Sequence, residues 1–258
     1  MRQGLILLTF VILCAALLSG ALFCAPRNIN RNNSSIQIVP AQQLPIKPGE
    51  KLSYEVTFNR LKAGTIDFEY LSRKGNVDLV VVTTKINVLN IFRIDSKDSV
   101  YIDAATCLPQ KVERDVVFFG RPEHIIEEYN QKDGWVNVIQ EKGGKVKSQI
   151  IPQAPPIHNS HSLFFIYPLD LENKIGAQLD FNLPLEKVKI KVKELRKAQT
   201  SQGEREFYVC EVSPKKIVLE LDKEKRVPLK LEMPALWSKL VITRLPLAKA
   251  SQNSLRSP

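Results

Sequence analysis

Two of the chain's three histidines, His158 and His161, lie three residues apart, directly before a dense apolar run. On a helical turn this spacing places both imidazoles on one side, where they could bind a metal ion or exchange protons. Zinc needs three or four ligands, and the remaining candidates are distant in sequence: His124, Cys107 and Cys210. No C-x2-C pair or H-E-x-x-H motif supports a Cys2His2 site. The sequence therefore predicts no metal and no cofactor here.

Catalysis by a nucleophile or an acid pair has equally little support. The chain has no G-x-S-x-G motif and no glycine-rich phosphate loop. In "HIIEEY", Glu127 and Glu128 fall on opposite faces of a strand, so they cannot converge on one substrate. We predict no catalytic residue and a protein that is not an enzyme, with an unrecognised hydrolase-like site as an alternative.

The elements around these residues alternate between apolar and polar positions. In "KLSYEVTFNR" one face carries Leu52, Tyr54, Val56 and Phe58, and in "TIDFEYL" it carries Ile66, Phe68 and Tyr70. This period of two is typical of half-buried antiparallel strands. Glycine-containing turns separate many such segments along the chain. The sequence therefore predicts an all-β fold, an antiparallel β-barrel or strongly curved sheet.

One segment, "NSHSLFFIYPLDLENKIG", breaks the alternation. A capping Asn or Ser, a continuous apolar run and Pro168 as a stop predict one short capping helix or turn. The aromatic residues either fill the core or line a ligand cavity, which barrels of this size can enclose. The candidates for this cap or cavity are Leu163, Phe164, Phe165, Tyr167 and Phe118.

The N-terminus predicts export. The uncharged run from Gly4 to Ala25 follows a short basic start, which is typical of a signal peptide, and it is also long enough for a membrane anchor helix. We predict a signal peptide or anchor over 1–25, a disordered linker over 26–46, a β-barrel-like domain over 47–246 and a disordered tail over 247–258. The expected location is the periplasm or cell envelope of a bacterium.

The formal net charge is +10. Export argues against nucleic acid as a partner, and no compact basic run with interleaved aromatics is present. In "KVKIKVK" the inward positions are Val188, Ile190 and Val192, and the opposite face carries Lys187, Lys189, Lys191 and Lys193. This row is either a solvated face or a contact surface for anionic envelope polymers or lipids.

Only two cysteines belong to the expected domain. In an oxidising compartment Cys107 and Cys210 could form one disulfide, but two separately buried thiols are the favoured alternative.

Three stretches resemble the bacterial exported family catalogued as domain of unknown function 3108. They are "GEKLSYEVTFNRLKAGTIDF", the apolar segment around Leu163 to Tyr167, and "IVLELDKEKRVPLKLEM" with Asp222, Arg226 and Pro228 at its turn. The resemblance covers roughly residues 48 to 245. It implies an exported antiparallel barrel or curved sheet, similar in shape to envelope proteins of capsule assembly and to lipoprotein carriers, without an established activity. Family members often carry an arginine at the end of the aromatic segment, where this chain has Tyr167 and Pro168.

The sequence thus predicts a non-enzymatic envelope protein. The expected partners are an apolar (lipid) or glycan ligand or other envelope proteins, with membrane contact through residues 4–25 if these are retained. The alternative is a structural or interaction protein that uses its lysine-rich face.

Overall fold

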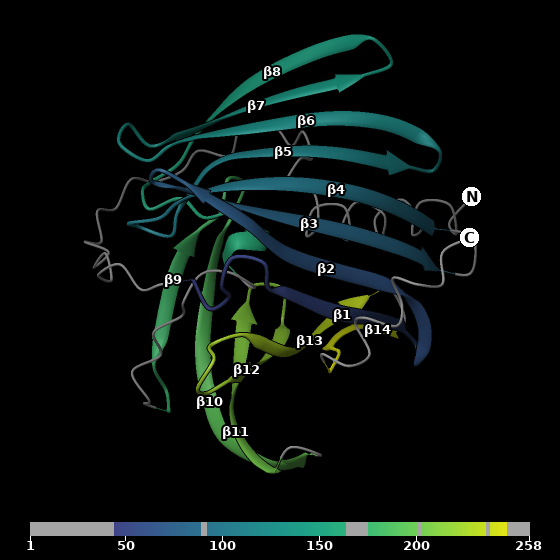
Figure 1. Cartoon of the computed structure of the whole chain (residues 1–258), viewed down its shortest axis with the longest axis vertical. Helices are drawn as coiled ribbons and strands as arrows, with labels where there is room; N and C mark the ends of the chain where they lie inside the picture. The colour runs from purple at the N-terminus through teal and green to yellow at the C-terminus, as the bar shows by residue number, and fades with distance from the viewer. Residues whose placement is uncertain (1–43, 89–91, 164–174, 201–202, 236–237, 247–258) are drawn as a thin grey trace.

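A computed structural model describes residues 44–88, 92–163, 175–200, 203–235 and 238–246. Fourteen strands account for most of these residues (Figure 1). Their bounds are β1 Lys51–Phe58, β2 Leu61–Lys74, β3 Val77–Val88, β4 Phe92–Asp103, β5 Pro109–Phe118, β6 Arg121–Asn130, β7 Trp135–Lys142, β8 Lys145–Pro152, β9 Gln178–Asn182, β10 Lys187–Thr200, β11 Gly203–Ser213, β12 Ile217–Asp222, β13 Pro228–Ala235 and β14 Ser238–Arg244.

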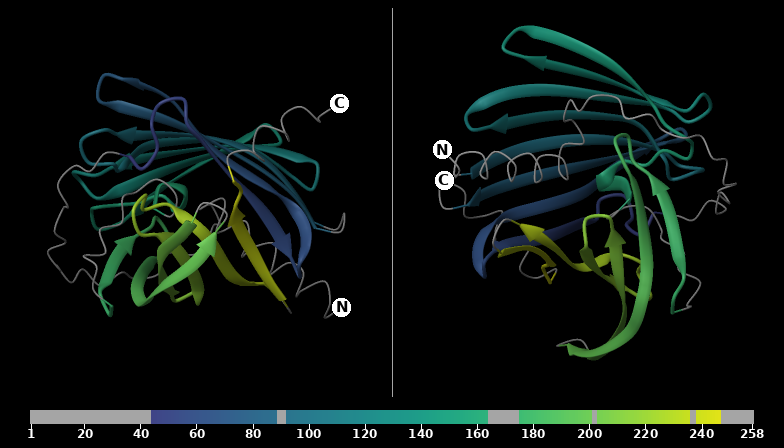
Figure 2. Two further views of the ribbon diagram at one scale, coloured as in Figure 1. Left: turned by 60° about the horizontal axis from the view of Figure 1, so that its bottom comes forward. Right: turned by 180° about the vertical axis from the view of Figure 1, so that it is seen from behind.

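All fourteen strands form one antiparallel sheet, in the order β8-β7-β6-β5-β4-β3-β2-β1-β14-β13-β12-β11-β10-β9. The prediction of an all-β fold with a strongly curved sheet is confirmed. The closed-barrel alternative is wrong for the described residues, because β8 and β9 are the two edges and do not pair with each other. The sheet instead curls so that its second half passes beneath its first half (Figures 1 and 2).

The predicted capping helix falls only partly within the described residues. Residues 160–163 form one helical turn, in which the Leu163 N–H donates to the Asn159 carbonyl over 2.8 Å. No complete helix occurs in the described part of the chain, and none there is long and apolar enough to cross a bilayer. Phe164, Phe165 and Tyr167, like the expected N-terminal signal or anchor, lie outside the described residues.

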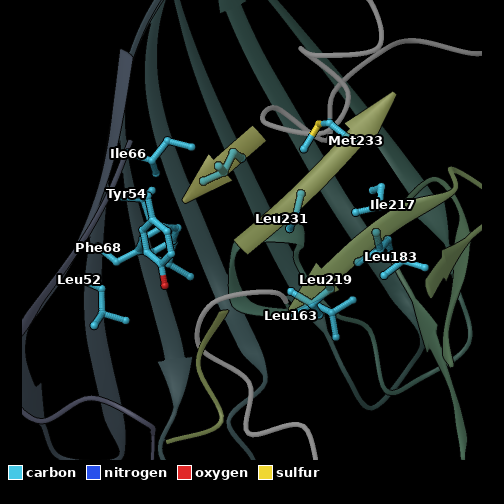
Figure 3. Close-up of a cluster of buried hydrophobic side chains, with 14 of the residues drawn as sticks. Leu52, Tyr54, Ile66, Phe68, Leu163, Leu183, Ile217, Leu219, Leu231 and Met233 are labelled. Carbon is cyan, nitrogen blue, oxygen red and sulfur yellow. The ribbon is translucent and has the colours of Figure 1, made fainter. Parts of the chain in front are cut away.

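The alternation in sequence becomes the two faces of the sheet. The inward positions predicted for β1, β2 and β10 are buried, and Lys187, Lys189, Lys191 and Lys193 are exposed. The inner faces of the two halves pack against each other: Tyr54 and Phe68 lie on one side, and Leu219 and Leu231 on the other (Figure 3). Leu163 is fully buried in this core and belongs to the predicted cap.

The sheet repeats one six-stranded unit. We call β1–β6 the first unit and β9–β14 the second unit; the β7–β8 hairpin follows the first. In both units the first strand is preceded by a glycine with positive φ, 82° at Gly49 and 91° at Gly176. The Gly49 N–H donates to Tyr70 and the Gly176 N–H to Val192, over 2.7 and 2.9 Å. In each unit the pairing of the second and third strands shifts register directly after Tyr70 or Val192. The two units therefore start and bulge at matching positions.

The turn between the fourth and fifth strands matches as well. Asp103 and Asp222 each accept two backbone N–H bonds, from the residues two and three positions later, over 3.0 and 2.8 Å in both turns. Each turn then contains a residue with positive φ, Cys107 at 56° and Arg226 at 55°. Asp and Asn favour such turns because their side chains mimic a backbone acceptor. The strand pairing after the turn also agrees, since Ile102 pairs with Pro109 as Leu221 pairs with Pro228.

Candidate functional site: a buried charged cluster beneath a strap

A row of charged residues crosses the inner face of the first unit. Asp98 on β4 is paired with Arg114 on β5, and Glu127 lies on β6 beside them. The Arg114 Nε donates to Asp98 Oδ2 over 2.7 Å, and its Nη1 lies 3.5 Å from Glu127 Oε1. All three side chains are 1–2 % exposed. Alternation along each strand directs them to the same face, so three successive strands build this row.

The segment from Gln153 to Leu163, which we call the strap, runs over this row. Its His161 Nε2 lies 2.9 Å from Asp98 Oδ2, and its Asn159 Nδ2 donates to Glu127 Oε2 over 3.1 Å. Asn159 also donates to the Tyr129 hydroxyl, which in turn donates to Glu127. Asp98, Arg114, Glu127, Tyr129, Asn159 and His161 together form what we call the clamp.

Hydrogen bonds also hold the start of the strap, to a residue directly after the first unit and to a residue of the second unit. The Gln131 side chain, after β6, accepts from the Ile157 N–H and donates to the Ile157 carbonyl, both over 2.8 Å. Asn182 at the end of β9 donates its side-chain amide to Ala154 and accepts from the His158 N–H, both over 2.7 Å. The strap therefore bridges the two units before it reaches the clamp.

The clamp strongly shifts proton affinities. Burial alone would raise the pKa of Asp98, but the Arg114 guanidinium and hydrogen bonds from His161 and Ser96 outweigh it and lower that pKa to about 2. Burial opposes the charge on Arg114, yet Asp98 and Glu127 hold its pKa above the usual value. Burial and the Glu127 charge raise the pKa of the Tyr129 hydroxyl well above 10. Asp98 and Arg114 are thus ionised at neutral pH, and Tyr129 is neutral.

His158 has a different environment from His161. Its ring packs edge-on against Phe181 at 5.0 Å, and burial lowers its pKa to about 3. It is therefore a neutral, packed side chain at neutral pH. The two histidines that the sequence places three residues apart thus do different things: His158 packs toward the second unit and His161 contacts Asp98 in the first. In the described part of the chain no group of three or more His, Cys, Asp or Glu is arranged to bind a metal.

The His161–Asp98 pair resembles half of an acid–base relay, but it lacks access to a substrate. Two hydroxyls of the site are already engaged: Ser96 donates to Asp98, and Ser162 donates to the Asn159 carbonyl over 2.9 Å. His161 is 3 % exposed. The arrangement holds the strap in place and offers no open position for a reacting group.

The other predicted site residues are dispersed. Phe118 is partly buried and packs against the core and against Phe92 and Phe119, with ring centroids 5.7 and 4.7 Å away. Cys107 and Cys210 are free and buried in the structure. Cys107 lies in the β4–β5 turn of the first unit and Cys210 on β11 of the second, and burial raises the pKa of these thiols to about 11 and 12.

A pocket of about 430 Å³ lies where β2, β3 and β4 end. Its apolar lining comes from Ala63, Ile86 and Ile94, and its charged lining from Lys85, Arg93 and Asp95. Gly64 borders it and packs so closely on β3 that a Cβ atom would lie 1.9 Å from the Lys85 carbonyl oxygen. An apolar lining with charged groups at its rim suits a small amphiphilic ligand.

The clamp was missed from sequence, although a signal existed. Asp98, Arg114 and Glu127 all occupy inward positions of their strands, where the alternation otherwise places apolar residues. The predicted separation of Glu127 and Glu128 onto opposite faces is confirmed, since Glu127 is buried and Glu128 is exposed.

These features define a class of protein: an open antiparallel sheet made of two similar six-stranded units, with a buried charged cluster in one of them. A family model described as "Protein of unknown function (DUF3108)" matches residues 53–243, and the chain belongs to this family. The crystal structure of a β-barrel-like protein of the domain of unknown function DUF1849 from Brucella abortus is similar at 11 % identity. The superposition covers 81 % of this chain and 97 % of the Brucella abortus chain, with a TM-score of 0.48. No curated protein matches the sequence.

Proposed function

We propose that the protein is a non-enzymatic binding protein of the bacterial cell envelope, and that it holds an apolar or glycan ligand or a segment of an envelope partner. The carrying observation is the clamp, which fixes the strap across the inner face of an unclosed sheet. A buried ion cluster is seldom more stable than well-packed apolar residues, and its better-attested role is to specify one arrangement. The position of the strap is therefore the property that this cluster specifies.

The second unit supports this interpretation. Strand pairing matches Asp98, Arg114 and Glu127 with Ile217, Met233 and Ile242, which are all buried. The same architecture thus forms without charges at these positions. The charges serve the strap, which contacts the clamp in the first unit only.

The proposal of a non-enzymatic role rests on the burial of the clamp. A substrate would have to displace the strap before it could reach His161 or Asp98, and both side chains are at most 4 % exposed. The pocket beside Ile86 and Ile94 is the open feature that suits a ligand better.

The lysine-rich face is the weaker alternative. Lys193 pairs with Glu211 over 2.5 Å, and Lys189 lies 4.0 Å from Asp180. Acidic neighbours thus offset part of the row that Lys187–Lys193 would offer to an anionic polymer.

The test is to purify the full chain from its host and identify bound molecules by mass spectrometry after extraction. A variant that gives the first unit the residues of the second, D98I/R114M/E127I, should fold and release the strap, measured as faster proteolysis within residues 153–163, and should lose the bound material. Wild-type protein without a lipid or glycan, or a variant that retains its ligand with the strap released, would contradict the proposal. A solvent-exposed control is Glu128→Gln, which should leave both measurements unchanged.

A further inference from the structure

The two ends of the strands in the first half of the sheet differ in charge. We call the turns β1–β2, β5–β6 and β7–β8, together with the strand ends beside residues 89–91, the basic rim; it lies at the right in Figure 1. The turns β2–β3, β4–β5 and β6–β7 form the opposite rim. Because the strands are antiparallel and consecutive, these two sets of turns necessarily lie at opposite ends.

Within three residues of its turns, the basic rim carries seven cations and two acids. The cations are Arg60, Lys62, Arg93, Arg121, Lys142, Lys145 and Lys147; the acids are Glu123 and Glu141. The opposite rim carries four of each, namely Arg73, Lys74, Lys111 and Lys132 against Asp78, Asp103, Glu128 and Asp133. The positive charge of this half is therefore concentrated at one end.

Several cations of the basic rim have no nearby acid to neutralise them. Lys62 pairs with Glu55 and Lys142 with Glu123. Arg60, Arg121 and Lys145 are exposed and form no salt bridge with any residue that the structure describes. Such cations remain available to an external anion.

The basic rim also exposes large apolar side chains. Leu61 is 58 % exposed and Phe119 is 47 % exposed, each beside a hairpin turn. Phe119 has a φ of 49°, in a two-residue turn that usually takes Asn or Gly at this position. A bulky residue in the left-handed region is strained, and such strain is a pointer to function. Its ring packs on Phe92 and Phe118, which direct it to the outside of the core.

We propose that the basic rim docks on an anionic lipid bilayer. Lysine and arginine near an anionic surface each add a favourable electrostatic contribution, and exposed aromatic and aliphatic tips insert at the headgroup boundary. The rim combines both kinds of residue, and its row of turns presents them along one end of the sheet (Figure 2). This inference goes beyond the proposed function and does not depend on it, because docking needs no ligand inside the sheet.

The test compares co-sedimentation of the full chain with vesicles of phosphatidylcholine and with vesicles that also contain phosphatidylglycerol. Because residues 4–25 carry no charge, any binding through them is common to both kinds of vesicle, and the measured quantity is the additional binding that phosphatidylglycerol produces. For R60E/R121E this addition should fall roughly tenfold or more, since two contacts with the anionic surface become repulsive. The control K74E/K132E makes the same change in net charge at the opposite rim and should retain the wild-type value.

A second pair of variants tests the apolar contribution without altering charge. Phe119→Asn should weaken vesicle binding several-fold and still fold, because Asn tolerates the positive φ and so offsets part of the ring packing that is lost. Leu71→Asn, at a site 46 % exposed toward the opposite rim, should leave binding unchanged. The proposal is overturned if phosphatidylglycerol adds no binding to the wild type, or if the rim variants bind as well as their controls.

Discussion

The first unit buries a charged row across β4, β5 and β6, whereas the second unit places Ile217, Met233 and Ile242 at the matching positions of β12, β13 and β14. Both units otherwise share their starting glycine, their bulge and their aspartate turn. The comparison shows that the backbone arrangement common to both units forms with or without the charged row. The fold needs the backbone pattern and inward burial, and only the first unit places charges at these three inward positions.

This comparison also turns the second unit into a set of control residues within the same chain. A substitution in the clamp can be made to the residue that the other unit already uses in the same surroundings. The change in stability then measures the loss of the charge network, because the new side chain already fits this position in the other unit.

The largest expected effect follows from breaking the clamp at one residue. Arg114→Met leaves Asp98 and Glu127 buried without their cation, and should lower the free energy of unfolding by about 3–5 kcal/mol. D98I/R114M/E127I should recover a large part of this loss, although it replaces three charged side chains instead of one. Urea denaturation of the three proteins measures both changes. If the triple variant is less stable than the single one, the charges are required for folding and the comparison fails.

The second effect is a loss of stability in acid that comes from the strap. The pKa of His158 is about 3 when folded and near 6.5 when unfolded, so between these values the unfolded chain binds a proton that the folded chain does not. Stability should therefore fall as the pH drops from about 6.5 to 3, by about 1.4 kcal/mol per pH unit at most. His158→Gln should flatten that part of the profile. Asp98 has a folded pKa of about 2, below its unfolded value, and adds a further loss only below about pH 4.

Urea midpoints measured at several pH values check this prediction. A His158→Gln profile that keeps the wild-type slope between pH 6 and 4 would assign the acid sensitivity to other groups.

The third effect tests the match between the two turns. Asp103→Ala and Asp222→Ala each remove two backbone hydrogen bonds, so each should cost about 1–2 kcal/mol. Thermal unfolding of both variants should give similar losses. A loss of stability in only one of the two variants would show that the two turns contribute unequally to stability despite their equal geometry.

The smallest effect is expected on the outer face. Lys111 pairs with Glu113, and Lys230 pairs with Glu232 at the matching place, both partly exposed. Glu113→Gln and Glu232→Gln should each change stability by no more than about 0.5 kcal/mol, because solvent screens such pairs. A loss above 1 kcal/mol in either variant would indicate that the pair belongs to a larger network.

The strands were predictable because burial on one face enforces the period of two, as in "KLSYEVTF" and "KVKIKVK". Closure was not predictable, because it depends on whether the edge strands meet after many small twists between neighbours. The repeat was not predictable from a fixed spacing either. Tyr70 matches Val192 and Val100 matches Leu219, and loops of different length change the distance in sequence from strand to strand.

The clamp escaped sequence reasoning for a related reason. Asp98, Arg114 and Glu127 belong to three different strands, and His161 comes from a segment that follows two more strands. Only the register of the sheet brings them together. The available signal was a charged residue at an inward position in each of three successive strands. It predicts a buried cluster only when these strands are known to be neighbours in the sheet.

The pairing of β1 with β14 joins the two units into one sheet. β1 lies against β14 in the register in which β7 lies against β6, with Tyr54 opposite Arg244 as Val136 is opposite Tyr129. The last strand of each unit therefore offers the same edge for pairing, which β7 occupies on β6 and β1 occupies on β14.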